Sequence, residues 1–131
     1  TQSYHREVAK SVDEIPEAVK SLLSRVRDPQ FTKVLIVTLP EATPTHEAAA
    51  LQDDLRRAGI EPYGWIVNRS FAFSGTKDPV LCAKSIDELA YINEILDHHS
   101  NRTVISPWVP QELNGSENLK QLIAYGIEGS I

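Results

Sequence analysis

The feature that most constrains this sequence is a continuous run of aliphatic and β-branched residues between Lys33 and Leu39. A strand with one solvated face alternates apolar and polar side chains, and this run does not alternate. It therefore predicts a strand that is covered on both faces within a parallel sheet. An aspartate introduced at Val37 would then enter the interior, and we expect it to unfold the domain.

The rest of the chain alternates between helical and strand patterns. Apolar residues at helical spacing predict four helices, at 13–27, 43–58, 78–97 and 117–124. Short apolar runs predict two further strands, at 63–68 and 103–106. Such alternation with short connections is typical of an α/β fold, so we expect a mainly parallel sheet with helices on both faces. Three strands leave two edges unprotected, unless more strands lie upstream.

Capping residues mark several of these boundaries. Asp13 is the expected N-cap of the first helix, and Asp28-Pro29 ends that helix because the residue before proline disfavours the helical backbone. Thr43 and Pro44 are expected as the N-cap and first residue of the second helix, with Gly59 as its left-handed terminator.

Composition and charge exclude several classes of protein. With 131 residues, of which 41% are hydrophobic and 24% charged, the chain is typical of one soluble globular domain over 1–131. No apolar run approaches the ~20 residues that span a bilayer, and no signal peptide opens the chain. A net charge of −5 argues against nucleic acid as a partner. The single cysteine, Cys82, cannot form an intrachain disulfide, which favours a reducing cytoplasm.

Polar residues follow each predicted strand. In open parallel sheets, ligands bind beyond the carboxyl ends of the strands. Glu41 could form a salt bridge there, or could simply satisfy a helix N-terminus. Asn68 carries both a donor and an acceptor, which suits the edge of a purine, although asparagine also forms turns at such positions. The segment from Pro107 to Gly115 could wrap a flat ring, or could be only a proline-rich connection.

Sequence motifs for catalysis are absent. Neither a Gly-rich phosphate loop nor a dinucleotide-binding glycine pattern occurs among the six glycines. His5 and His46 lack metal-motif spacing, and His98-His99 is interpreted as a solvated helix cap. We therefore expect no metal site and no catalytic residue in this chain, which on its own is not a complete enzyme.

Several segments together are similar to those of a known family. They are Ser3–Glu7, Thr32–Glu41, Glu47–Gln52, Asp54–Ile60, Tyr63–Asn68 and Asp78–Cys82. With this combination the chain resembles the arsenical pump-driving ATPases over essentially its whole length, up to about Ile123. The resemblance implies a P-loop ATPase of three-layer α/β/α architecture that works as a homodimer or pseudo-dimer.

The resemblance also implies where this chain falls within such an ATPase. The family's phosphate loop and Mg²⁺ ligands precede the position of Thr1, so the chain would be the C-terminal part of a domain that uses ATP and Mg²⁺. The absence of methionine fits a piece of a longer protein. Matched by position, Asn68 resembles the adenine-recognition residue, and Glu41 the acid that approaches nucleotide near the dimer interface. The residues that resemble the loop beside the adenine ring are Pro107, Glu112 and Gly115.

The implied function is an arsenite- or antimonite-stimulated ATPase that drives a membrane arsenical efflux pump. Its implied partners are the pump, the upstream half of the same ATPase and ATP, and its implied place is the cytoplasm, at the inner membrane. Relatives that target tail-anchored membrane proteins carry a C-x-x-C zinc pair where this chain has Cys82-Ala-Lys-Ser85. The serine weakens that targeting-chaperone alternative. A third alternative is a non-catalytic α/β binding module.

Overall fold

A computed structural model describes residues 16–125 and 127–129, and the chain divides into two compact units, residues 1–33 and 34–131. In the first unit, helix α2 (Glu17–Arg27) begins after Pro16 and has Asp28 as its C-cap. Asp28 Oδ1 then accepts a hydrogen bond from the backbone N–H of Gln30 at 2.8 Å, which closes the following turn. The predicted stop at Asp28 is confirmed, whereas Asp13, the predicted N-cap, lies outside the described residues.

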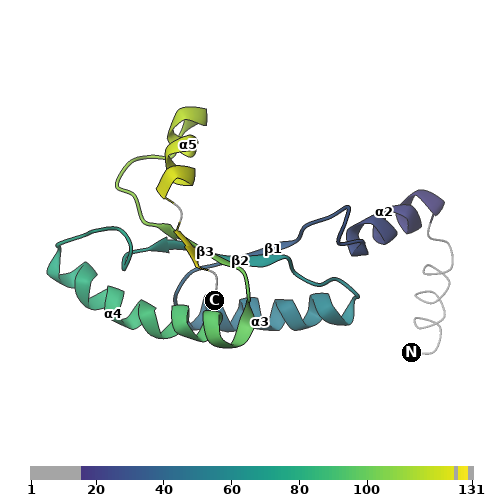
Figure 1. Cartoon of the computed structure of the whole chain (residues 1–131), viewed down its shortest axis with the longest axis horizontal. Coiled ribbons are helices and arrows are strands. Elements are labelled where there is room, and N and C mark those ends of the chain that lie inside the picture. Colours follow the sequence, from purple (N-terminus) through teal and green to yellow (C-terminus); the bar gives the residue numbers. More distant parts are fainter. Residues whose placement is uncertain (1–15, 126, 130–131) are drawn as a thin grey trace, which may run out of the picture. The chain divides into compact units, whose positions relative to one another are not determined.

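The second unit contains a four-stranded sheet in the order β1-β2-β3-β4. Its elements are β1 (Leu35–Thr38), α3 (Ala42–Arg57), β2 (Gly64–Ser70), α4 (Pro79–Glu94), the π-helical turn η1 (Ile95–His99), β3 (Thr103–Pro107), α5 (Gly115–Tyr125) and β4 (Ile127–Gly129). Strands β1, β2 and β3 are parallel. Helices α3 and α4 lie on one side of them and α5 on the other (Figure 1). The predicted α/β fold is therefore confirmed.

Strand β4 is the element that the sequence pattern did not predict. It pairs antiparallel with β3, so that one of the two edges expected to be open is paired. Its three residues are too few to show a strand periodicity. Strand β1 pairs only with β2 within the described part of the chain, and its other edge is free there.

Several helix boundaries differ from their predicted positions, and α5 extends slightly beyond the predicted 117–124 at both ends. Helix α3 begins at Ala42 with Glu41 as its N-cap, so Thr43 and Pro44 lie inside its first turn, where a missing N–H is tolerated. The predicted start of α4 is confirmed, because Asp78 Oδ1 accepts from the N–H of Val80 at 2.9 Å. The α-helix ends at Glu94 rather than near Asp97. Of the helices that the structure describes, none has the length and apolar character needed to cross a membrane.

The hydrophobic core lies between the sheet and helices α3 and α4. Its buried members are Ile36, Ala48, Trp65, Val67, Ile92, Ile95 and Ile105. Strand β1 is covered on this side only: Ile36 is 3% exposed, whereas Leu35 and Val37 are 49% and 59% exposed. The prediction that β1 is buried on both faces is thus wrong for the described residues. Because α5 packs on β3, it leaves the second face of β1 open.

A polar chain of contacts runs through this core. The indole N–H of Trp65 donates to Gln52 Oε1 at 2.8 Å, and Gln52 Nε2 donates to the backbone oxygen of His99 at 2.9 Å. The His99 ring stacks on Trp65, with centroids 5.5 Å apart. Gln52 therefore satisfies both a buried indole and a carbonyl at the end of η1. The interpretation of His99 as a solvated cap is wrong, because the ring is half-buried against Trp65.

The connection from α3 to β2 carries an exposed ion pair. Arg56 Nη2 lies 2.8 Å from Glu61 Oε1, and the hydrogen bond lowers the pKa of Glu61 below its ordinary value. The same bond raises the pKa of Arg56. Since both side chains are solvated, the pair contributes at most about 1 kcal/mol to stability. Gly59, with φ of +82°, ends the helix before it as predicted.

Candidate functional site

The carboxyl ends of β2 and β3 lie side by side and carry a pocket. The backbone N–H of Trp108 donates to the oxygen of Ser70 at 2.9 Å, which joins the two strand exits. Asn68 and Pro107, both predicted site residues, line the same pocket of about 270 Å³. The other lining residues are Arg69, Trp108, Val109, Gln111, Leu113 and Leu122. Two amides, one cation and one large aromatic ring thus line a mostly apolar hollow, the usual composition of a small-molecule site.

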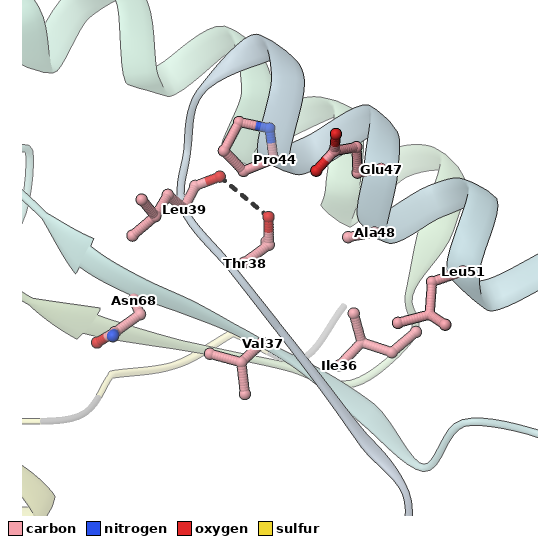
Figure 2. Close-up of a pocket in the computed structure, with 9 residues that line it drawn as sticks. All are labelled: Ile36, Val37, Thr38, Leu39, Pro44, Glu47, Ala48, Leu51 and Asn68. Atoms are coloured by element: carbon pink, nitrogen blue, oxygen red, sulfur yellow. Dashed lines mark hydrogen bonds between the residues drawn. The ribbon is translucent and has the colours of Figure 1, made fainter.

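Asn68 is the polar group best placed to read a ligand. Its side chain is half-buried, and its amide makes no hydrogen bond with any residue that the structure describes. Asn68 also borders a second pocket, of about 340 Å³, that runs along β1. Figure 2 shows this pocket, with Pro44, Glu47, Ala48 and Leu51 from α3 near β1 and Asn68 on the neighbouring strand. Asn68 therefore lines two pockets, and its amide carries both a donor and an acceptor.

Glu41 lies in a different hollow from Asn68. Its backbone oxygen accepts from the N–H of Thr45 at 3.0 Å as the first bond of α3, but its carboxylate makes no capping hydrogen bond. The carboxylate instead lies 4.0 Å from Lys84 Nζ. Together with Arg69, both residues line a smaller pocket of about 130 Å³. The alternative interpretation of Glu41, as an acid that only satisfies a helix N-terminus, is therefore not supported by a side-chain cap. Arg69 lines both this smaller pocket and the Asn68 pocket.

Glu112 and Gly115 do not line the Asn68 pocket, although Gln111 and Leu113 beside them do. The carboxylate of Glu112 accepts from Asn114 Nδ2 at 2.9 Å, and its backbone oxygen accepts from Asn118 Nδ2 at 3.1 Å. Gly115 has φ of +83° at the start of α5, a conformation that a side chain would strain. Both residues shape the loop that carries the pocket wall. Their direct contact with a ligand stays a prediction.

Two residues at this edge were missed by the sequence reasoning. Arg69 has φ of +56° and follows Asn68 directly. The available sequence signal for it was the polar triplet Asn68-Arg69-Ser70 at the end of an apolar strand. Glu88 is buried on α4, with 3% of its surface exposed. Its carboxylate accepts from Ser70 Oγ at 2.9 Å and from the N–H groups of Phe71 and Ala72, both at 3.1 Å. The sequence signal for Glu88 was its position four residues before the core residue Ile92, because that spacing places the acid on the buried face of the helix.

The aromatic side chains near the pocket complete its geometry. The rings of Phe71 and Trp108 are tilted against each other with centroids 5.6 Å apart, and Lys84 Nζ lies 5.5 Å above Phe71. In residues 16–125 and 127–129, no group of three or more His, Cys, Asp or Glu side chains is arranged to hold a metal ion. The described site therefore offers stacking, amide and cationic contacts.

Comparison with known proteins assigns the family. The chain matches the anion-transporting ATPase family over residues 1–125, and it belongs to that family. The arsenical pump-driving ATPase of Acidiphilium multivorum is 42% identical over 124 residues, which cover 95% of this chain and 21% of that protein. Two arsenical pump-driving ATPases of Escherichia coli are 43% and 40% identical over 93% and 94% of this chain. The chain thus spans about a fifth of the length of these relatives.

Proposed function

We propose that this chain is the base-binding, C-terminal part of an ATPase domain, and that the whole protein hydrolyses ATP to drive a membrane pump for arsenicals. The observation that carries the base-binding role is the unpaired amide of Asn68 beside Trp108 and Pro107. An asparagine amide can donate to one and accept from another of two adjacent positions on an adenine edge. The Trp108 ring and the Pro107 ring offer flat apolar surfaces against which the base can lie.

The remaining predicted site residues have supporting places in this proposal. Glu41 would face the nucleotide at the interface between two ATPase halves, a position that its exposed carboxylate beside Lys84 permits. Glu112 and Gly115 would hold the loop that closes over the base. We assign the phosphate loop and the Mg²⁺ ligands to the part of the relatives' length that this sequence does not cover. The 131-residue chain alone is then expected to hydrolyse no ATP above background, because that loop clamps the transferred phosphate.

The base assignment predicts a loss of nucleotide discrimination. In the full-length protein, Asn68→Ala should weaken the preference for ATP over GTP by about 1–3 kcal/mol, because a buried polar contact to the base is lost. Competition binding with the two nucleotides measures the difference. Asn101→Ala, at an exposed asparagine before β3, is the matched control and should leave the preference unchanged. Equal affinities for ATP and GTP in both the natural protein and Asn68→Ala would refute the assignment.

The pump assignment predicts activation by metalloid. The names of the relatives associate them with an arsenical pump, so ATP hydrolysis by the full-length protein should rise several-fold when antimonite is added. A steady-state phosphate-release assay with and without antimonite measures this. A high rate of ATP hydrolysis that does not change when antimonite is added would favour the targeting-chaperone alternative. No activity in either condition would favour a non-catalytic binding module.

A further inference from the structure

The carboxyl end of β2 contains a bulge that bends the chain at the candidate site. Val67 pairs with Ile105, and the next matched pair is Ser70 with Pro107, so Asn68 and Arg69 together oppose a single residue of β3. Arg69 has φ of +56°, and it is the only non-glycine residue with positive φ in the described part of the chain. This conformation is unfavourable for arginine, as it is for most residues that carry a Cβ.

The surrounding contacts hold this strained residue in place. Immediately after Arg69, the buried carboxylate of Glu88 accepts from the Ser70 hydroxyl and from two successive backbone N–H groups. The oxygen of Ser70 accepts in turn from the N–H of Trp108. Residues in sparsely populated backbone regions persist where their neighbours over-determine them, and they concentrate at binding sites. These contacts hold the bulge firmly, as expected where a strand has to present one particular side chain, here that of Arg69, to a ligand.

The side chain that it presents is a cation without a counterion. Arg69 is exposed and makes no ion pair or hydrogen bond with the residues that the structure describes. It borders the Asn68 pocket on one side and the smaller Glu41 pocket on the other. The smaller pocket also contains Lys84, so two cations face one carboxylate there. Such an excess of positive charge next to a base-sized hollow favours an anionic group attached to the base.

We propose that Arg69 binds a phosphate group of the nucleotide whose base lies against Asn68. The guanidinium carries a fixed fork of donors that matches phosphate oxygens, and a charge-assisted pair of this kind is stronger than a neutral hydrogen bond. This assignment rests on the proposed function, since it requires the base to occupy the Asn68 pocket. Glu88 acts through the bulge as a positioning residue and does not touch the ligand.

The test compares two ligands that differ only in phosphate. Calorimetric titration of the full-length protein with ADP and with adenosine should show that Arg69→Asn weakens ADP binding about tenfold or more and changes adenosine binding less than twofold. Asparagine is the chosen replacement because it tolerates the left-handed backbone while removing the charge. Arg69→Lys keeps a charge at the same strained position and should recover part of the ADP affinity. Arg57→Asn, at an exposed arginine of α3, is the matched control and should leave both ligands unaffected.

Each contrary result has a separate meaning. If Arg69→Asn weakens ADP and adenosine equally, Arg69 only shapes the base pocket and the phosphate contact is refuted. If Arg69→Asn binds ADP as tightly as the natural protein, the phosphate contact is refuted as well. The base site is tested independently by Asn68→Ala, which should weaken adenosine and ADP alike. If Arg69→Asn weakens ADP binding but Asn68→Ala leaves the adenosine affinity unchanged, Arg69 contacts phosphate while the base lies elsewhere. That result would refute the base assignment and, with it, the nucleotide placement proposed here.

Discussion

Replacing Ile36 with aspartate should unfold the chain, whereas the same replacement one residue later, at Val37, should be tolerated. Ile36 points into the core and is 3% exposed, while Val37 lies on the open face of β1 and is 59% exposed. An unpaired carboxylate in an apolar core costs about 4 kcal/mol or more, a large part of the 5–15 kcal/mol by which domains are usually stable. At Val37 the cost is the strand preference, about 1 kcal/mol or less.

The pair forms its own control, because both variants place the same charge in the same strand. Circular dichroism during heating measures the midpoint of unfolding of the 131-residue chain and of each variant. Ile36→Asp should show no cooperative transition, and Val37→Asp should keep most of the natural midpoint. If Val37→Asp unfolds the chain as completely as Ile36→Asp, β1 is covered on both faces after all.

Removing the carboxylate of Glu88 should have the second largest effect. Glu88→Leu keeps a buried side chain of similar size but leaves the Ser70 hydroxyl and the N–H groups of Phe71 and Ala72 without their acceptor. Unpaired donors in a partly buried loop are expected to lower the free energy of unfolding by about 3 kcal/mol. Urea titration measures this loss. Binding of ADP by the full-length variant should fall as well, because the bulge that carries Asn68 and Arg69 loses its support.

Asp87 provides the comparison for this variant. It precedes Glu88 on α4 and is exposed, so Asp87→Leu should change the free energy of unfolding by no more than about 0.5 kcal/mol. The loss of unfolding free energy in Glu88→Gln should lie between the losses in Glu88→Leu and Asp87→Leu. The glutamine amide retains one acceptor oxygen but brings an NH₂ group toward donors. Identical urea midpoints for the Leu variants at 87 and 88 would contradict the role given to this carboxylate.

The fold was predictable where the sequence carries strong local signals. The aliphatic run before Glu41 and the capping residue Asp78 placed a strand and a helix correctly, since both depend on neighbouring residues only. Whether a strand is covered on one face or two depends on which elements pack on it, and Val37 shows that an apolar run alone does not determine this. Strand β4 and the π-helical turn depend on long-range contacts, such as the bond from Gln52 to His99 across 47 positions.

The site was predictable only in part. The rule that ligands bind at the carboxyl ends of parallel strands predicted that Asn68 and Pro107 lie at one site, and both residues line the same pocket. The left-handed backbone of Arg69 arises from the register between β2 and β3, which no residue of β2 specifies alone. Glu88 accepts hydrogen bonds from Ser70, Phe71 and Ala72, which lie 16 to 18 positions before it in the sequence. Local sequence patterns could therefore not predict these partners either.

The placement of the two tryptophans gives this chain a pair of separate optical reporters. Trp65 is 1% exposed and stacked on His99 in the core, so its emission will follow the loss of packing during unfolding. Trp108 stands at the wall of the Asn68 pocket, where a stacked base would change its emission while the core stays intact. Replacing either tryptophan with phenylalanine would isolate the other signal. Folding and occupancy of the pocket can then be followed in the same cuvette without any added label.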